Sequence, residues 1–365
     1  MKKYILLFLL FKISISHAQV VGGERTFEFL RLSSSPHISA LGGYCVSNPA
    51  KEISIAFGNP ALLRAYAHTQ LSLNYNFYYA NTKVTNLLYG YHVPTIQTTF
   101  GLGLQYINYG KFVQTDNIGN QQGDFMASDY AIHFMASKAY LEKWRGGIDL
   151  KYAHSRLATS KSSAILADIG ISYADTINKI YIGAVVKNAG IQLKKYNQQN
   201  ASEPLPLDLQ IGITKRFKKA PFSISILGHH LYQWNVRYDN PADIVDNTLF
   251  VTDTIAQEKQ KTYFADKLFR HLVFSLDIKL GKRLELSAGY NHLRRSELSF
   301  VEKKGLSGFS FGAGLYLNKY IVHYARSYYH LAGAYNELGI NFSMNRLFGF
   351  QSNTIHWNQK YADCF

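Results

Sequence analysis

Residues 272 to 290 read LVFSLDIKLGKRLELSAGY, two alternating segments joined by a tight turn. Apolar residues occupy every second position from Leu272 to Leu280, and again from Leu284 to Tyr290. A period of two is that of a β-strand whose two faces meet different surroundings. The stretch therefore predicts a β-hairpin with one apolar face and one largely polar face.

The same alternation recurs along the chain from residue 69 and predicts about fourteen strands. Most segments are about ten residues long, the length that a tilted strand needs to cross a bilayer. No stretch after residue 18 is apolar over the length of a membrane-spanning helix, so membrane residence would depend on strands. The strands are expected near residues 69–79, 83–93, 97–109, 125–137, 144–154, 163–174, 179–188, 206–217, 221–232, 270–280, 283–292, 308–317, 320–328 and 335–346.

The expected connections alternate between short and long. VPTI at 93–96 and GK at 281–282 are short, whereas the segments at 110–124, 155–163 and 233–269 are expected as longer loops. Outer-membrane barrels have short turns at the periplasmic rim and longer loops at the outer rim, and a soluble sandwich has no such alternation. The fold class is therefore all-β, a transmembrane antiparallel barrel of about fourteen strands with both termini periplasmic. A soluble periplasmic β-protein is the alternative.

Charged residues on the polar faces of these strands would line the lumen, because each would cost several kcal/mol if it faced lipid. They are Asp149, Lys151, Asp168, Asp208, Asp277, Lys279 and Glu285.

The N-terminal 68 residues divide into two parts. MKKYILLFLLFKISISHA at 1–18 has the basic start, apolar run and small-residue ending of a signal peptide. Residues 19–68 are expected to form a hatch, because a barrel of about fourteen strands encloses more space than its own side chains fill. Glycines and Asn-Pro pairs suit compact irregular structure there. The barrel is expected over 69–350, followed by a tail at 351–365.

Cysteine usage and charge limit the possible functions. Cys45 and Cys364 are too few for a disulfide framework, and the sequence leaves open whether they pair. The formal net charge is +15, but the basic residues are scattered and the chain is expected to be exported, so nucleic acid is not an expected partner. Basic residues in expected outer loops are either solvated or in contact with lipopolysaccharide phosphates. They are Lys194, Lys195, Arg294, Arg295, Lys303 and Lys304.

No motif for catalysis or cofactor binding can be assembled. The sequence lacks Gly-x-Ser-x-Gly, His-Glu-x-x-His, Cys-x-x-Cys and the phosphate-binding Gly-x4-Gly-Lys-Ser/Thr. His229 and His230 are adjacent, so in a strand they would point to opposite faces and could not bind one metal together. We therefore expect a protein that is not an enzyme and has no cofactor or bound metal.

FEFLRLSSSPHISALGGYCVS at 27–47, followed by NPALL at 59–63 and a β-rich chain, resembles the PorV/PorQ branch of FadL-like outer-membrane barrels. HHLYQWNVRYDNP at 229–241 is most similar to the PorQ members. His37 and Ile38 stand where this branch usually has an Arg-Ala pair. The resemblance implies a fourteen-stranded barrel with an N-terminal hatch. It also implies a place in the type IX secretion system, holding a PorZ-like surface protein near PorU and PorV. The hatch motif comprises Leu41, Gly42, Gly43, Asn59, Pro60 and Ala61.

Two functions are therefore considered. The first is a non-enzymatic surface anchor of the type IX attachment complex, and the alternative is a FadL-like transporter of a hydrophobic small molecule. The 233–269 loop is the expected partner-binding loop, because it combines aromatic anchors with a polar rim. Its candidate residues are Trp234, Tyr238, Asp239, Phe250, Tyr263 and Phe264.

Overall fold

The computed structural model describes residues 25–197, 202–236, 264–297, 305–330 and 333–348. The expected signal peptide and C-terminal tail lie outside these ranges.

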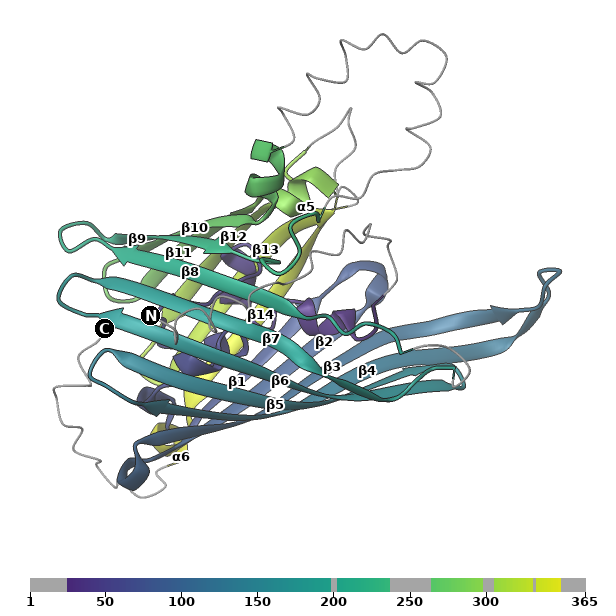
Figure 1. Cartoon of the computed structure of the whole chain (residues 1–365), viewed down its shortest axis with the longest axis horizontal. Helices are drawn as coiled ribbons and strands as arrows, with labels where there is room; N and C mark the ends of the chain where they lie inside the picture. Colours follow the sequence, from purple (N-terminus) through teal and green to yellow (C-terminus); the bar gives the residue numbers. More distant parts are fainter. Residues whose placement is uncertain (1–24, 198–201, 237–263, 298–304, 331–332, 349–365) are drawn as a thin grey trace, which may run out of the picture.

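Fourteen antiparallel strands form one closed barrel in chain order, and the pairing of β1 with β14 completes it (Figure 1). The expected antiparallel barrel and its number of strands are confirmed. The strands are β1 (Gln70–Phe77), β2 (Lys83–Val93), β3 (Thr98–Thr115), β4 (Gln121–Ala139), β5 (Trp144–Leu157), β6 (Ser160–Asp175), β7 (Ile180–Lys194), β8 (Asp208–Arg216), β9 (Phe222–Gly228), β10 (Leu272–Leu280), β11 (Leu284–Asn291), β12 (Phe309–Tyr316), β13 (Tyr320–His330) and β14 (Gly333–Ser343).

The two faces of the wall differ as the alternation predicts. In the β10–β11 hairpin, Asp277 is 2% exposed and Glu285 is 4% exposed, whereas Leu284 and Leu286 are 37% and 39% exposed. Apolar side chains on the outside are what a wall that faces lipid requires. Six of the seven charged residues expected in the lumen are buried, and only Lys279 among them is partly exposed.

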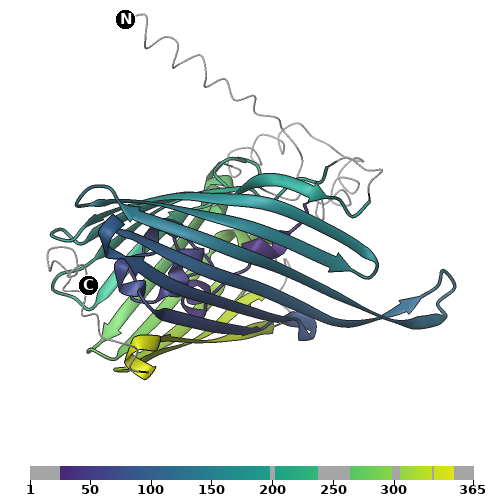
Figure 2. The same cartoon turned by 90° about the horizontal axis from the view of Figure 1, so that it is seen from below.

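The wall is much taller on one side than on the other. Strands β3 to β7 have 18, 19, 14, 16 and 15 residues, whereas β8 to β12 have only 7 to 9. The ends of β3 and β4 extend beyond the rest of the wall as a hairpin (Figures 1 and 2).

Two loop predictions are therefore wrong. Residues 110–124 form most of the projecting hairpin, in which β3–β4 pairing continues to Thr115 and Gln121 and the rings of Phe112 and Phe125 stack at 5.3 Å. Residues 155–163 complete the β5–β6 hairpin, whose pairing reaches Leu157 and Ser160.

The first described segment, Arg25–Thr69, forms the hatch and lies inside the barrel (Figure 2). At the end of the barrel that carries the longer connections, the long-loop end, the Thr26 backbone N–H donates to the Pro204 carbonyl oxygen (3.2 Å). At the opposite short-turn end, Thr69 N–H donates to the Gly90 carbonyl oxygen (2.8 Å), and β1 begins. The hatch therefore crosses the lumen from one end to the other.

The helices are short, and none within the described ranges is both long and apolar enough to span a membrane. The hatch contains η1 (Glu28–Arg31), α2 (Pro36–Ala40), η2 (Ile53–Phe57), η3 (Pro60–Leu62) and η4 (Ala65–Ala67). Outside it are η5 (Tyr79–Asn81), η6 (Pro94–Ile96), α5 (His292–Glu297) and α6 (Met344–Phe348).

Candidate functional site

The Leu41-Gly42-Gly43 part of the hatch motif ends helix α2. Gly42 and Gly43 have φ of +90° and +89°, the left-handed region that glycine enters at little cost, and Gly43 N–H donates to the Ile38 carbonyl oxygen at 2.9 Å. A Cβ on Gly43 would lie 2.5 Å from the Tyr329 hydroxyl. The motif therefore stops the helix and lets its end approach the wall.

The Asn59-Pro60-Ala61 part fixes the turn of the hatch at which η3 begins. Asn59 Oδ1 accepts from the backbone N–H of Ala61 (2.9 Å), which caps η3, and Asn59 Nδ2 donates to the Val46 carbonyl oxygen (2.9 Å). The turn rests directly on the wall, because a Cβ on Gly147 would lie only 2.6 Å from the Pro60 oxygen. The hatch motif thus supplies close packing between hatch and wall.

Arg294 binds the hatch from α5, and its expected contact with lipopolysaccharide is therefore wrong. Its Nη1 donates to the Gly42 carbonyl oxygen at 3.0 Å, and its guanidinium lies over the Tyr329 and Tyr44 rings. The signal that could have found it is the carbonyl-rich end of α2, which needs a donor, but the sequence does not show which arginine reaches it.

The other expected lipopolysaccharide contacts lie at or near the long-loop end, where they stay predictions. Lys194 ends β7 and is exposed, and Lys195 follows it. Arg295 Nη1 donates to the carbonyl oxygens of Gly305 and Ser307, both at 3.3 Å. Lys303 and Lys304 lie outside the described ranges.

The expected partner-binding loop is described only at its two ends. Trp234 is 46% exposed and Phe264 is 65% exposed, and their ring centroids are 5.9 Å apart. Tyr238, Asp239, Phe250 and Tyr263 lie outside the described ranges. The two aromatic residues that can be placed therefore lie together at the long-loop end.

The adjacent histidines differ from the prediction. Strand β9 ends at Gly228, and His230 has a φ of 54°, so the two rings turn toward each other. Their Nδ1 atoms are 2.5 Å apart, and the opposite-face prediction is therefore wrong. Cys45 is buried, and Cys364 lies outside the described residues, so whether they pair stays open.

A network of histidines and carboxylates joins the hatch to β10, β11 and β13. Glu52 Oε1 accepts a hydrogen bond from His37 Nδ1 at 2.7 Å, and its Oε2 lies 2.8 Å from His323 Nδ1. Burial alone would lower the pKa of His37, but the carboxylates of Glu52 and Asp277 raise it well above its ordinary value. Burial would raise the pKa of Glu52, yet His323 and His37 hold it well below its ordinary value.

Two groups in this network have atoms that could ligate a metal, and within each group these atoms lie within 4.8 Å of one another. One group is His37, Glu52 and His323. The other is His37, Asp277 and Glu285.

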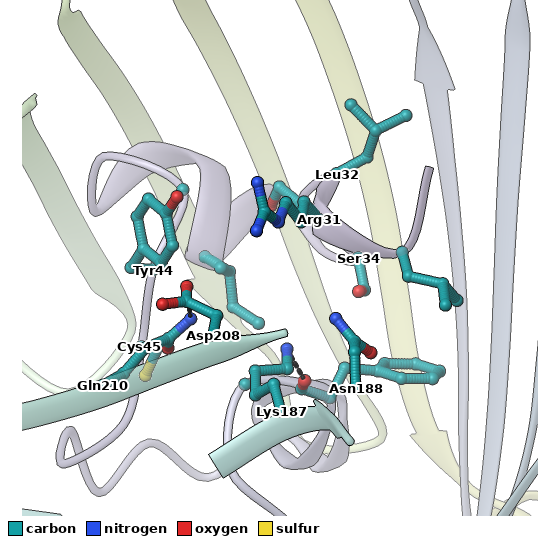
Figure 3. Close-up of a pocket in the computed structure, with 15 residues that line it drawn as sticks. Arg31, Leu32, Ser34, Tyr44, Cys45, Lys187, Asn188, Asp208 and Gln210 are labelled. Carbon is teal, nitrogen blue, oxygen red and sulfur yellow. Dashed lines mark hydrogen bonds between the residues drawn. The ribbon is translucent and has the colours of Figure 1, made fainter. Parts of the chain in front are cut away.

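A small cavity lies between the hatch and strands β7 and β8 (Figure 3). Arg31, Tyr44, Lys187, Asn188 and Asp208 are among the residues that surround it, and Lys187 Nζ donates to the Phe57 carbonyl oxygen at 2.8 Å. Its volume of about 20 Å³ is enough for one water molecule. It is too small for an organic ligand in this state.

Six apolar residues of the inner wall, called the recess below, lie in the long-loop half of the lumen. The hatch packs Phe27, Phe29 and Leu30 against them. Wall residues of the recess include three alanines, which leave room for these larger side chains. The recess is formed by Val84, Ile107, Ala131, Ala153, Ala164 and Leu166.

Comparisons with known proteins identify the fold. No family model and no curated protein matches the chain. Among solved structures, the CymD monoaromatic hydrocarbon channel has a TM-score of 0.50 and 13% identity, over 86% of this chain and 98% of that one. The chain shares the fold of CymD. The chain is also similar to the Pseudomonas putida toluene transporter TodX (TM-score 0.46, 13% identity, covering 85% and 96% of the two chains) and to a Pseudomonas aeruginosa FadL homologue (0.45, 10%, covering 85% and 98%).

These structural neighbours are FadL-type outer-membrane barrels; CymD is named as a channel and TodX as a transporter. At such low identity the likeness concerns the fold alone. The more specific resemblance to the PorV/PorQ branch, and the expected lack of enzymatic activity, stay predictions.

Proposed function

We propose that this chain is an outer-membrane channel for a small apolar molecule and that its own hatch closes it in the state described here. The observation that carries the proposal is the recess filled by Phe27, Phe29 and Leu30. A phenylalanine side chain is itself a substituted benzene, and CymD, which shares the fold, is named as a monoaromatic hydrocarbon channel. The phenyl rings of the hatch therefore occupy a place that suits such a molecule.

Opening requires η1 to leave the recess. The recess is lined by aliphatic side chains, and an apolar cavity of that kind stays dry and binds benzene-like molecules. Nearer the short-turn end the hatch packs Phe57 and Leu63 against Leu88 and Met135 of the wall. Polar contacts hold it there as well, because Asn59 Nδ2 donates to the Ile171 carbonyl oxygen at 3.2 Å and Glu52 Oε2 lies 2.8 Å from His323 Nδ1. Movement of η1 alone would admit a ligand to the recess. Passage through the barrel would require the hatch–wall contacts nearer the short-turn end to change as well.

The test uses Gram-negative cells that carry the protein in their outer membrane and the apolar fluorophore N-phenyl-1-naphthylamine. Cells with the wild-type protein should take up the fluorophore faster than cells with Ala131→Phe, which fills the recess. Ala127→Phe is the matched control, because Ala127 is a buried inward residue of the same strand outside the recess. Equal uptake by wild-type and Ala131→Phe cells, with both proteins folded, would overturn the channel.

The outer membrane of a Gram-negative bacterium is the location that the fold and the exposed apolar wall support. Cleavage after residue 18 and a periplasmic C-terminus belong to this proposal. The expected periplasmic N-terminus does not, because the six residues before Arg25 would span only about 20 Å. Arg25, the first described residue, lies at the long-loop end, where its Nη2 donates to Gln233 Oε1 at 2.8 Å. N-terminal sequencing of the protein from outer-membrane fractions would test the cleavage.

The tall half of the wall favours a second candidate, the surface anchor of the type IX secretion system. The projecting hairpin exposes Phe112, Val113, Ile118 and Met126, which are 42%, 53%, 84% and 62% exposed. Exposed apolar groups in a polar setting are what protein interfaces use. The sequence resemblance to the PorV/PorQ branch points to a PorZ-like surface protein and lipopolysaccharide as partners.

A pull-down from solubilised outer membranes would test the anchor. A large surface protein that co-purifies with the wild type, and is lost when 233–269 is deleted, would support it. Recovery of the barrel alone would leave the channel as the better account. No nucleic-acid partner is proposed.

A further inference from the structure

Three buried side chains face one another where the hatch meets the β10–β11 hairpin. His37 Nε2 lies 3.4 Å from Asp277 Oδ1 and 3.6 Å from Glu285 Oε1. His37 comes from α2, whereas the two carboxylates come from the wall, and the exposed fraction of each residue is 4% or less. The arrangement brings one imidazole nitrogen and two carboxylate oxygens together across the hatch–wall boundary.

The other ring nitrogen of His37 determines what Nε2 presents to these carboxylates. Nδ1 lies 2.7 Å from Glu52 Oε1, the length of a charge-assisted hydrogen bond, so Nδ1 carries a proton. A neutral ring protonated on Nδ1 has a lone pair at Nε2, and here that lone pair would point at two carboxylates. Such an arrangement needs a positive charge between the three groups.

The 3.4 Å separation of His37 Nε2 from Asp277 Oδ1 is that of a long hydrogen bond and also that of two ligands of one metal ion. Hydrogen bonds between charged nitrogen and oxygen atoms are about 2.7–2.9 Å long, shorter than both distances at Nε2. Two ligands of one tetrahedral zinc ion, each about 2.0–2.2 Å from the metal, are about 3.4 Å apart. By the same measure, the 2.7 Å hydrogen bond from His37 to Glu52 and the 2.8 Å distance from Glu52 to His323 leave no room for an ion.

We propose that His37, Asp277 and Glu285 bind a zinc ion that joins the hatch to the wall. Three protein ligands leave the fourth position of a tetrahedral zinc site for water. A hydrogen bond from the metal-ligating histidine to a carboxylate is the usual support of such a site, and Glu52 provides it. Among the common divalent ions, zinc is favoured over manganese and iron by a nitrogen and oxygen donor set.

The groups around the ligands suit this role. Asn48 Nδ2 donates to Asp277 Oδ2 at 2.7 Å, and Ser287 Oγ donates to Asp277 Oδ1 at 2.6 Å, which fixes that carboxylate. Lys279 Nζ lies 3.8 Å from Glu285 Oε2 and leaves Oε1 facing His37.

The charges in this cluster are compatible with a divalent ion. The carboxylates of Glu52, Asp277 and Glu285 outnumber the Lys279 ammonium by two, and a zinc ion at Nε2 would take the place of the proton that His37 otherwise carries there. Buried charge needs compensation, and one zinc ion supplies two positive charges. The ion would connect α2 to β10 and β11 whichever substance or partner the barrel serves.

The experiment uses the full mature protein, purified in detergent, stripped with a chelator and dialysed against zinc. Elemental analysis should give about one zinc per chain, and competition with a fluorescent zinc chelator would give its Kd. Asp277→Asn and Glu285→Gln keep the side-chain shape but remove the ligand charge, and each should weaken zinc binding more than 100-fold. Glu52→Gln should weaken it about 10- to 100-fold, as changes in residues that support a ligand do.

Glu337→Gln is the matched control, because Glu337 is a buried carboxylate on β14 that accepts from Ser39 of the hatch and is not among the three ligands. Its zinc affinity should equal that of the wild type, and unchanged gel migration of unheated samples would show that each variant is folded. X-ray absorption at the zinc edge should show only nitrogen and oxygen ligands. If a proton alone sits at Nε2, the protein will not bind stoichiometric zinc. A result without bound zinc would therefore overturn the proposal. So would zinc binding that Asp277→Asn and Glu285→Gln leave unchanged.

Discussion

The guanidinium carbon of Arg294 lies 3.3 Å from the centre of the Tyr329 ring, while Nη1 of the same side chain donates to the Gly42 carbonyl oxygen at 3.0 Å. One arginine thus connects a helix at the rim, a wall strand and the end of hatch helix α2. We expect Arg294→Met to lower the free energy of unfolding by about 2–4 kcal/mol, because a buried charged hydrogen bond and a desolvated cation–π contact are both lost. Chemical denaturation followed by tryptophan fluorescence would measure the loss.

The neighbouring Arg295 provides the control for that change. Its guanidinium donates to loop carbonyl oxygens at the rim and lies over the Phe309 ring of the wall. Arg295→Met should therefore have the smaller effect, and an equal effect of both substitutions would show that Arg294 does not act through the hatch.

Gly146 and Gly147 are adjacent in β5 and face opposite sides of the wall. A Cβ on Gly147 would collide with the Pro60–Ala61 backbone of the hatch, whereas a Cβ on Gly146 would meet no atom within 4 Å. Gly147→Ala should therefore lower stability by about 1–3 kcal/mol, the usual cost of overpacking, while Gly146→Ala should be nearly neutral. Limited proteolysis within residues 25–69 would show in addition whether the hatch has moved. Equal stability of the two variants would mean that the contact at Gly147 is not tight.

Cys45 should be unreactive in the folded protein. Burial raises the pKa of its thiol to about 12, so only about one molecule in ten thousand carries the thiolate at pH 8. In a Cys364→Ser variant, N-ethylmaleimide at pH 8 should modify Cys45 only after denaturation, and modification of folded protein should become faster as the pH rises. Rapid modification of the folded protein at pH 8, followed by mass spectrometry, would contradict the buried position.

The projecting hairpin should be dispensable for the barrel. The residues of β3 that follow Asn108 pair only with β4, and the residues of β4 that precede Ala127 pair only with β3. Residues 109–126 therefore add no pairing to the closed barrel. Replacing 110–125 by an Asn-Gly turn should leave the temperature at which the folded gel band disappears unchanged within a few degrees. A large fall in that temperature would show that the hairpin supports the wall.

The sequence predicted those parts of the fold in which the two faces of a strand meet different surroundings. The β10–β11 hairpin was predictable because Asp277 and Glu285 face the lumen while leucines face outward. The upper part of β3 and β4 was not, because above the wall both faces meet water and residues such as Gln114 and Gln121 need not alternate with apolar ones. Apolar and polar residues alternate only where the two faces of a strand meet different surroundings, and above the wall both faces meet water.

The candidate site was predictable only in part for a different reason. The hatch motif is visible because turns depend on local residues such as Gly42 and Asn59. The partners of the hatch are not local, since His37 and Asp277 are 240 positions apart, and Gly42 and Arg294 are 252 apart. No spacing rule relates such residues, so the closed barrel itself was needed to bring them together.

The path of the hatch has a consequence for how the protein can be made. Thr26 is held at one end of the barrel and Gln70 starts the wall at the other, so the chain runs through the ring formed by its own later strands. Helix α2 contacts β11 to β14, and η3 contacts β4 to β6, so the hatch touches strands from both halves of the sequence. Threading the N-terminal segment through a finished ring would be slow. We therefore expect the sheet to curl around this segment, so that the hatch acts as a template for barrel closure and the β1–β14 pair forms last.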